Sequence, residues 1–159
     1  MITIKSIVYK PENVRQAAGS IGYLRVPIQE AMLTQNYGIA GDRKGGNPKR
    51  NLNVMDDVTL AELGTEGYPT EAGVLGENII LSGIDLRTLP SGTRLRLGDE
   101  AVISIGALRV PCDQLTELDA RMPASVVGRV GSLCRVIVAG RIKVGDAVEI
   151  MNEAVPHAS

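Results

Sequence analysis

Residues 93–105, TRLRLGDEAVISI, carry the densest strand signal in the chain. Arginine and leucine alternate over residues 94–97, which is the period-two pattern of a strand with one buried face. Gly98 and Asp99 are typical turn residues, and the almost continuously apolar run 101–105 that follows is typical of a strand buried on both faces. This stretch therefore predicts two neighbouring strands joined by a tight turn.

Similar signals on both sides of this pair predict further strands and two short helices. The other strands are expected at residues 2–8, 22–34 (broken at Pro27), 76–81, 133–139 and 142–150, with turns at Gly140 and Gly145–Asp146. One helix is expected to be capped by Asp56 or Asp57 and to end before Gly64, and the other to be capped by Asp113 and to end before Pro123. Short strands at this spacing predict a mainly β fold, either a β-barrel or a β-rich α+β domain.

Length and composition narrow the possible functions. The 159 residues, 44% of them apolar, fit one domain, expected over residues 1–150 and followed by a polar tail at 151–159. Phe and Trp are absent, which counts against binding of single-stranded nucleic acid by base stacking. The net charge of −1 gives no general attraction to nucleic acid or membranes, and no stretch is apolar enough for a signal peptide or a membrane span. We therefore expect a cytoplasmic protein without a nucleic-acid or membrane partner.

The histidine and cysteine counts exclude several kinds of active site. The single histidine, His157, lies in the polar tail, so Ser-His-Asp, Cys-His and His-ligated zinc sites are not expected, and neither is haem. The two cysteines, Cys112 and Cys134, form no CxxC motif, and both are expected to be free thiols in a reducing compartment.

Residues 41–50, GDRKGGNPKR, form the first candidate site. The cations Arg43, Lys44, Lys49 and Arg50 stand among three glycines and a proline. Glycines allow close backbone approach to a ligand, and arginine offers a planar fork for phosphate or carboxylate. The segment is either an anion-binding loop or an exposed hairpin tip, and it lacks the spacing of a Walker A loop.

Residues 73–79, GVLGENI, form the second candidate. Glu77 and Asn78 would point to opposite faces of the predicted strand, so one of them is expected to face inward and to need a partner. This residue is either a ligand contact that supports the basic loop or part of an ordinary strand start.

Pro111, Cys112 and Asp113 form the third candidate. A helix that begins at Asp113 would lower the pKa of the Cys112 thiol, whereas the Asp113 carboxylate would raise it. A thiolate here suits sulfur transfer or ligation of a soft metal, and the alternative is a buried structural cysteine. Cys134 stands among β-branched residues in a predicted strand, where core filling is the simplest interpretation.

These segments, in this order, resemble the MOSC family, which takes its name from the C-terminal domain of molybdenum-cofactor sulfurases. The matching pieces are Gly41-Asp42-Arg43, Arg50 with 52–55, Leu75-Gly76-Glu77-Asn78, 83–86, 89–92, Leu97-Gly98, Pro111-Cys112 and 131–148. The resemblance covers residues 2 to 150, and the chain looks like a short, stand-alone member of the family.

The resemblance implies a β-rich barrel-like fold and a pocket for the molybdenum cofactor (molybdopterin). It implies that Arg43, Lys44, Arg50, Glu77 and Asn78 bind the cofactor. It also implies that Cys112 carries the chemistry, either as a persulfide sulfur carrier or as a thiolate ligand of molybdenum. The chain departs from the family pattern at Lys44, where relatives often have histidine, and it lacks the Gln-Val pair that many relatives have after Arg50.

Three functions stay open at this point. In the first, Cys112 accepts sulfur from a cysteine desulfurase and passes it to a metal or pterin site. In the second, molybdenum sits on Cys112 and the protein reduces N-hydroxylated compounds with electrons from a redox partner. In the third, the protein is a non-enzymatic cofactor carrier with Cys112 as an anchor.

Overall fold

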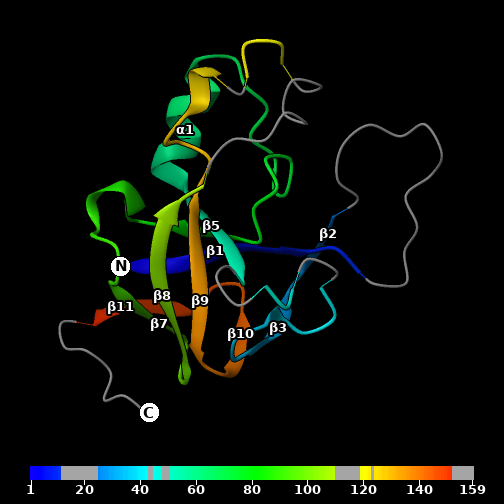
Figure 1. The fold of residues 1–159 in the computed structure, drawn as a ribbon, viewed down its shortest axis with the longest axis vertical. Helices are drawn as coiled ribbons and strands as arrows, with labels where there is room; N and C mark the ends of the chain where they lie inside the picture. Colours follow the sequence, from blue (N-terminus) through cyan, green and yellow to red (C-terminus); the bar gives the residue numbers. More distant parts are fainter. Residues whose placement is uncertain (12–24, 43–44, 48–50, 110–118, 123, 152–159) are drawn as a thin grey trace.

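Seven strands close into a mixed β-barrel in the computed structural model of the chain (Figure 1). The structure describes residues 1–11, 25–42, 45–47, 51–109, 119–122 and 124–151. Around the barrel the order is β11 (Ala147–Met151), β7 (Arg94–Leu97), β8 (Ala101–Leu108), β9 (Ser132–Val138), β5 (Leu52–Asp56), β6 (Ile79–Ser82) and β1 (Ile2–Tyr9), which pairs again with β11. The β5–β6 pair is parallel and the other barrel pairs are antiparallel. The predicted mainly β, barrel-like fold is therefore confirmed.

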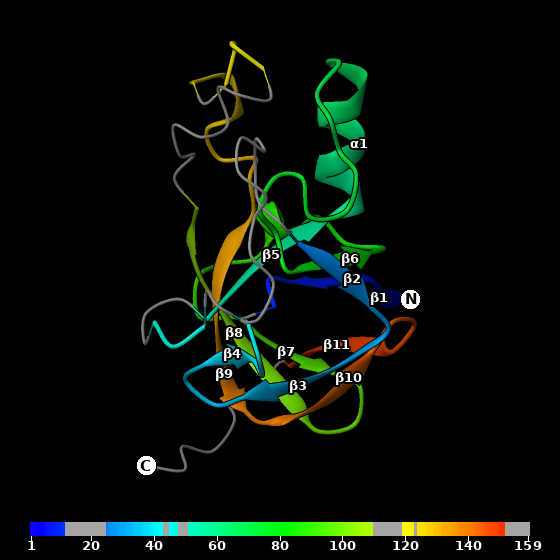
Figure 2. The same ribbon diagram turned by 90° about the vertical axis from the view of Figure 1, so that its right-hand side faces the viewer.

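A second sheet of three strands lies at one end of the barrel. It contains β10 (Gly140–Lys143), β3 (Glu30–Thr34) and β4 (Gly38–Ile39), in that order. Figure 2 shows it at the lower end of the molecule, with α1 at the opposite end. Its apolar residues Ala31, Leu33, Ile39 and Ile142 belong to the same buried cluster as the interior of the barrel.

The strand pair expected from residues 93–105 forms as β7 and β8. Leu97 pairs with Ala101, and Arg94 pairs with Ser104. Leu95 and Leu97 are fully buried, whereas Arg96 on the other face bonds to Glu149 of β11 at 2.6 Å. Alternation along this strand thus separates a core face from a solvent face, as the sequence predicts.

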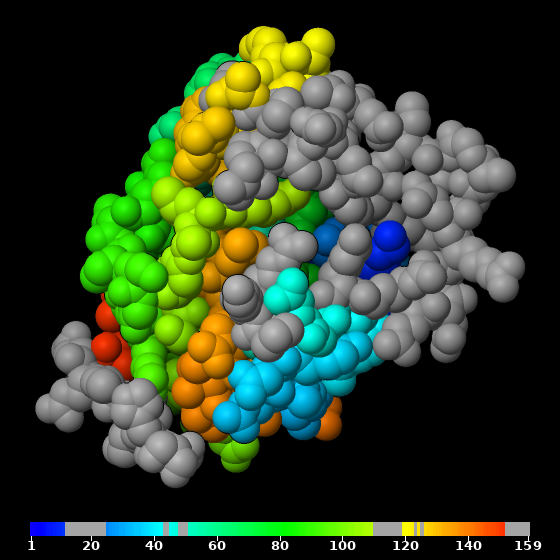
Figure 3. Space-filling model, in the orientation of Figure 1, coloured from blue at the N-terminus to red at the C-terminus, as the bar shows by residue number. Residues whose placement is uncertain are grey.

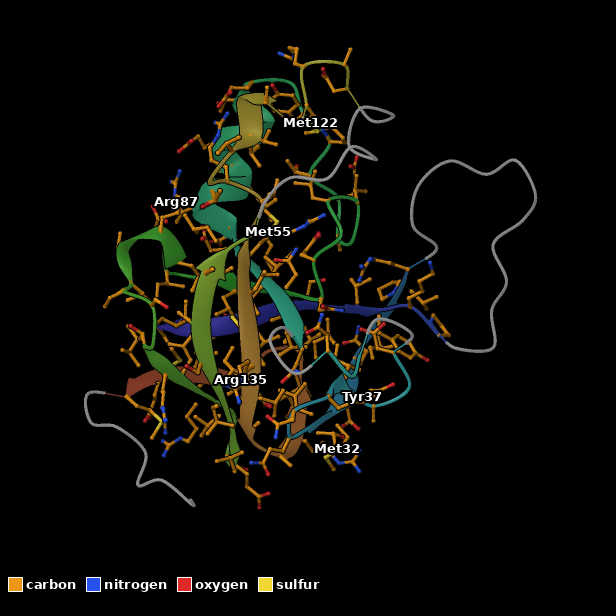
Figure 4. All side chains as sticks on the ribbon, in the orientation of Figure 1. Met32, Tyr37, Met55, Arg87, Met122 and Arg135 are labelled. Carbon is orange, nitrogen blue, oxygen red and sulfur yellow. The ribbon has the colours of Figure 1, made fainter. Side chains whose placement is uncertain are left out.

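The helix α1 (Asp57–Thr65) packs on the outside of β5 and β6. Asp56 is its N-cap, and its carboxylate accepts a bond of 2.6 Å from Thr59 N. Val54 belongs to the barrel core, while Met55 and Ile80 belong to a second apolar cluster with the helix. The cluster consists of Met55, Leu60, Leu63, Tyr68, Leu75, Ile80, Met122, Val126 and Val130. Met55 and Met122 lie beside α1 in Figure 4.

Short 3-10 turns at Leu86–Thr88 and Ala124–Val126 complete the described elements.

Several predicted boundaries are wrong. Pro27 does not break its strand, because it lies within β2 (Val26–Ile28) and pairs with Val8 of β1; the break falls at Gln29. A proline is tolerated there because β2 is an edge strand, which pairs only with β1 in the described part of the chain. Residues 142–150 form parts of two strands, because the turn at Gly145, with φ +94°, reverses the chain between β10 and β11. The helix also extends past Gly64 to Thr65.

The helix predicted after Asp113 lies outside the described residues. Among the residues that the structure does describe, no helix is long and apolar enough to cross a membrane.

Candidate functional site

The basic loop is anchored by Asp42, which is 0% exposed. Its Oδ1 accepts a bond of 3.2 Å from Lys10 N, and its backbone oxygen accepts bonds from Tyr37 Oη at 2.9 Å and Gly45 N at 3.1 Å. An added Cβ at Gly45 would overlap the Tyr37 ring, so this glycine allows the loop to close over the tyrosine. The start of the loop is therefore fixed to the residue that follows β1 and to the segment after β3. The predicted site residues Arg43, Lys44 and Arg50 lie outside the described residues, as does Lys49.

Asn78 connects the basic loop to the barrel. Its Nδ2 donates to Asp42 Oδ2 at 3.1 Å and to Val8 O at 3.2 Å, and its Oδ1 accepts from Asn53 N at 3.0 Å. Its backbone NH donates to Asn53 O at 2.8 Å, and its backbone carbonyl accepts from Val8 N at 2.7 Å. One buried amide therefore joins the loop, β1 and β5.

Glu77 is also buried, so the expectation that only one of the pair faces inward is wrong. Both residues precede β6, which begins at Ile79, and the alternation rule for strands does not apply to them. Glu77 Oε1 accepts a bond of 2.7 Å from Gly73 N. Its Oε2 is buried and has no hydrogen-bond partner among the described residues. Burial raises the pKa of Glu77 from 4.5 to about 7, against the lowering effects of backbone NH groups and of Arg25 and Arg109.

Arg109 joins the same turn to the segment that contains Cys112. Its Nη1 donates to Leu75 O, and a Cβ at Gly76 would lie 3.2 Å from Nη1 and Nη2. Gly76 has φ +89°, so it provides both the conformation and the space that the guanidinium needs. Arg109 stands three positions before Cys112, which lies outside the described residues. The 73–78 turn thus contacts Asp42 on one side and Arg109 on the other.

The structure also points to two residues that the sequence prediction missed, Arg25 and Arg109. Arg109 follows an apolar strand and precedes Val110-Pro111-Cys112, so its position next to a candidate site could have identified it from the sequence. Arg25 carries no such signal, because only the fold brings it to Gly73.

Figure 3 looks onto the face where these parts meet. Three segments are visible there: the end of β8 (yellow-green), the end of β1 with the described residues that follow it (blue), and the described part of the basic loop (cyan). A separate hollow of about 540 Å³ lies between α1, β1 and β2, and neither Glu77 nor Asn78, the predicted site residues that the structure describes, lines it.

Cys134 fills the core, as the sequence predicts. It is 0% exposed in β9, and burial raises the pKa of its thiol to about 12. Its Sγ lies 3.6 Å from Ser132 O, to which it donates. At neutral pH it is therefore a protonated, inaccessible thiol. No group of three or more His, Cys, Asp or Glu side chains within the described ranges could hold a metal ion.

Replacing Glu77 tests the burial of its carboxyl. Because its pKa is raised, the folded protein holds a proton that the unfolded chain releases above pH 4.5, and stability falls as the pH rises toward about 7. Glu77→Gln has no such proton. Between about pH 6 and 8.5 the wild type should lose about 1 kcal/mol more stability than Glu77→Gln.

Urea unfolding of both proteins at several pH values measures this difference. Parallel pH profiles for the two proteins would show that Glu77 has an ordinary pKa.

Comparison with known proteins identifies a family and a fold. The family model described as "MOSC domain" matches residues 41–149. Among solved structures, YiiM from Geobacillus stearothermophilus has a TM-score of 0.74 at 20% identity, over 96% of this chain and 76% of that chain. The YuaD protein from Bacillus subtilis has a TM-score of 0.73 at 19% identity, over 94% and 96%. YiiM from Escherichia coli has a TM-score of 0.66 at 23% identity, over 97% and 72%. At these identities the likenesses show the fold, and no curated protein matches the chain.

Proposed function

The chain belongs to the MOSC domain family, which is associated with the molybdenum cofactor, and we propose that it binds this cofactor and carries sulfur on Cys112. The observation that supports the proposal is the junction at the 73–78 turn. There Asn78 bonds to Asp42 at the start of the basic loop, and Leu75 accepts a bond from Arg109, which leads into the Cys112 segment. Three stretches that are distant in the sequence therefore converge.

The charges of the basic loop suit an anionic cofactor. Arg43, Lys44 and Arg50 would hold the terminal phosphate of the cofactor, because guanidinium groups bind phosphate in a bidentate manner. Asp42 and Asn78 would fix the start of the loop, and the buried Oε2 of Glu77, which no described residue contacts by a hydrogen bond, offers a polar contact. The bound cofactor supplies molybdenum with sulfur ligands, for which a thiolate from Cys112 is a suitable neighbour.

The sulfur step is a thiol exchange on Cys112. Its thiolate attacks the outer sulfur of a persulfide on a cysteine desulfurase, the S–S bond of the donor breaks, and the donor leaves as a thiolate. Cys112 then holds the outer sulfur as a persulfide, with no net oxidation. Transfer to an acceptor thiolate repeats this exchange, whereas release as sulfide requires two electrons from a dithiol reductant.

The arginines of the loop provide the test of cofactor binding. Arg43→Lys and Arg50→Lys keep the charge but lose the fork, so each should weaken binding about tenfold. Arg43→Lys should have the larger effect, because it follows the anchored Asp42 directly. Lys49→Ala is the control and should have a smaller effect, because a lysine ammonium is a point charge that lacks the bidentate geometry of a guanidinium.

The measurement is a titration of each variant with the pterin cofactor, or its phosphate-bearing precursor, at two salt concentrations. Equal affinities for the wild type and both arginine variants would make the loop a solvated hairpin tip and remove this part of the proposal.

A further inference from the structure

The turn at residues 73–77 surrounds a buried acid. Gly73 and Gly76 have φ values of +84° and +89°, and Gly76 N donates to Gly73 O at 3.0 Å. The Glu77 side chain folds back beneath the turn and bonds to Gly73 N, and its second oxygen is buried without a partner in the described part of the chain. A buried carboxyl oxygen without a donor is costly when ionised, so this arrangement favours a bound proton.

Two arginines flank this turn. An added Cβ at Gly73 would lie 3.4 Å from Arg25 Cβ, and one at Gly76 would lie 3.2 Å from both terminal nitrogens of Arg109. Both arginines are half-buried, and both act electrostatically on Glu77. A guanidinium carries five donors, so Arg109 can hold Leu75 O and an oxyanion at the same time.

We infer that Arg25 and Arg109 form a second anion site over the 73–77 turn, and that Glu77 takes up a proton when an oxyanion occupies this site. The inference rests on the proposed function only for the identity of the natural occupant, which would be an anionic group of the molecules that this function involves. This group is a phosphate or carboxylate, either of the cofactor or of a substrate.

The linkage follows from the charges around Glu77. Burial raises the pKa of its carboxyl to about 7, while the backbone NH groups of Glu77 and Gly73 and, to a smaller extent, the positive charges of Arg25 and Arg109 act to lower it. An anion bound to the arginines offsets those charges, so the pKa rises further and Glu77 binds a proton near neutral pH. Among the described residues, Arg25 and Arg109 are the charged side chains that act on Glu77, and the carboxylate of Asp42 accepts a bond from the neighbouring Asn78.

Sulfate is the probe, because it binds guanidinium groups and does not itself titrate near neutral pH. Calorimetric titration in two buffers of different ionisation enthalpy gives both the affinity and the protons taken up per sulfate. The wild type should take up a fraction of a proton. Glu77→Gln should still bind sulfate, with no proton uptake. Arg109→Gln should lose about tenfold or more in affinity.

Control variants separate this site from the basic loop and from the thiol. The double variant Arg43→Gln with Arg50→Gln should keep the proton uptake, and so should Cys112→Ser, whatever its sulfur chemistry. Arg135→Gln, which removes an exposed arginine on β9, should match the wild type. Arg109→Lys provides a folded charge-retaining variant if Arg109→Gln unfolds, and it too should bind sulfate more weakly.

Three results would overturn the inference. They are wild-type affinity in both Arg109 variants, proton uptake that persists in Glu77→Gln, and proton uptake that disappears with the loop arginines. Failure of Cys112 to accept sulfur would contradict the proposed function and leave this linkage unaffected.

Discussion

Asn78→Asp should destabilise the protein by about 3 kcal/mol at neutral pH. The amide Nδ2 donates to Asp42 Oδ2 and to Val8 O, and an ionised carboxylate at this position can donate to neither. It would instead place a second negative charge next to the buried Asp42 carboxylate. The loss should appear in the midpoint of urea or thermal unfolding.

Asn36→Asp is the matched control. Asn36 is exposed, and its Oδ1 accepts a bond of 3.4 Å from Arg135, which a carboxylate also accepts. Its unfolding midpoint should stay close to that of the wild type. If Asn78→Asp were as stable as this control, the buried amide would not be the junction between loop and barrel.

Cys112→Ser should abolish sulfur loading and leave the fold intact, because it removes a thiolate and almost no volume. Cys134→Ala should have the opposite effect. It should keep loading and cost about 1 kcal/mol through a small cavity in the core. Loading is measured by mass spectrometry after incubation with a persulfide donor, and stability by thermal unfolding.

Alkylation of the native protein tests the same pair of cysteines. Cys112 should react quickly and Cys134 slowly, because the Cys134 thiol is buried with its pKa raised to about 12. Rapid labelling of Cys134 with a protected Cys112 would reverse the assignment.

The parts of the fold that follow local patterns are predictable from the sequence. The β7–β8 hairpin is set by alternation and a Gly-Asp turn within a few residues, and Cys134 is recognisable as core from its β-branched neighbours. Strand β5 was not predicted, because its residues Leu52–Asp56 mix apolar side chains with Asn53 and Asp56 and show no alternation. All five are buried. Asn53 Nδ2 donates to the distant Val130 O, and Asp56 accepts from the distant Leu86 N as well as from the nearby Thr59 N.

The candidate site shows the same division. Glu77 and Asn78 were identifiable as polar residues in an apolar stretch, but their shared burial depends on a turn whose partners lie in β1, β5 and the basic loop. The order of the motifs along the chain indicated the MOSC family, and the family model over residues 41–149 confirms that family. Arg25 lies close to Gly73, and Arg109 lies close to Gly76, because distant segments pack together. Such packing cannot be predicted from a local sequence pattern.

The proposed function of this MOSC protein is binding of the molybdenum cofactor together with sulfur transfer on Cys112. Its most direct test is analysis of the full chain purified from a molybdenum-replete host, for pterin, for molybdenum and for the mass of the Cys112 peptide. We expect bound pterin cofactor and a mass increase of one sulfur atom on Cys112. Protein with neither pterin nor added sulfur, even after exposure to a persulfide donor, would overturn this function.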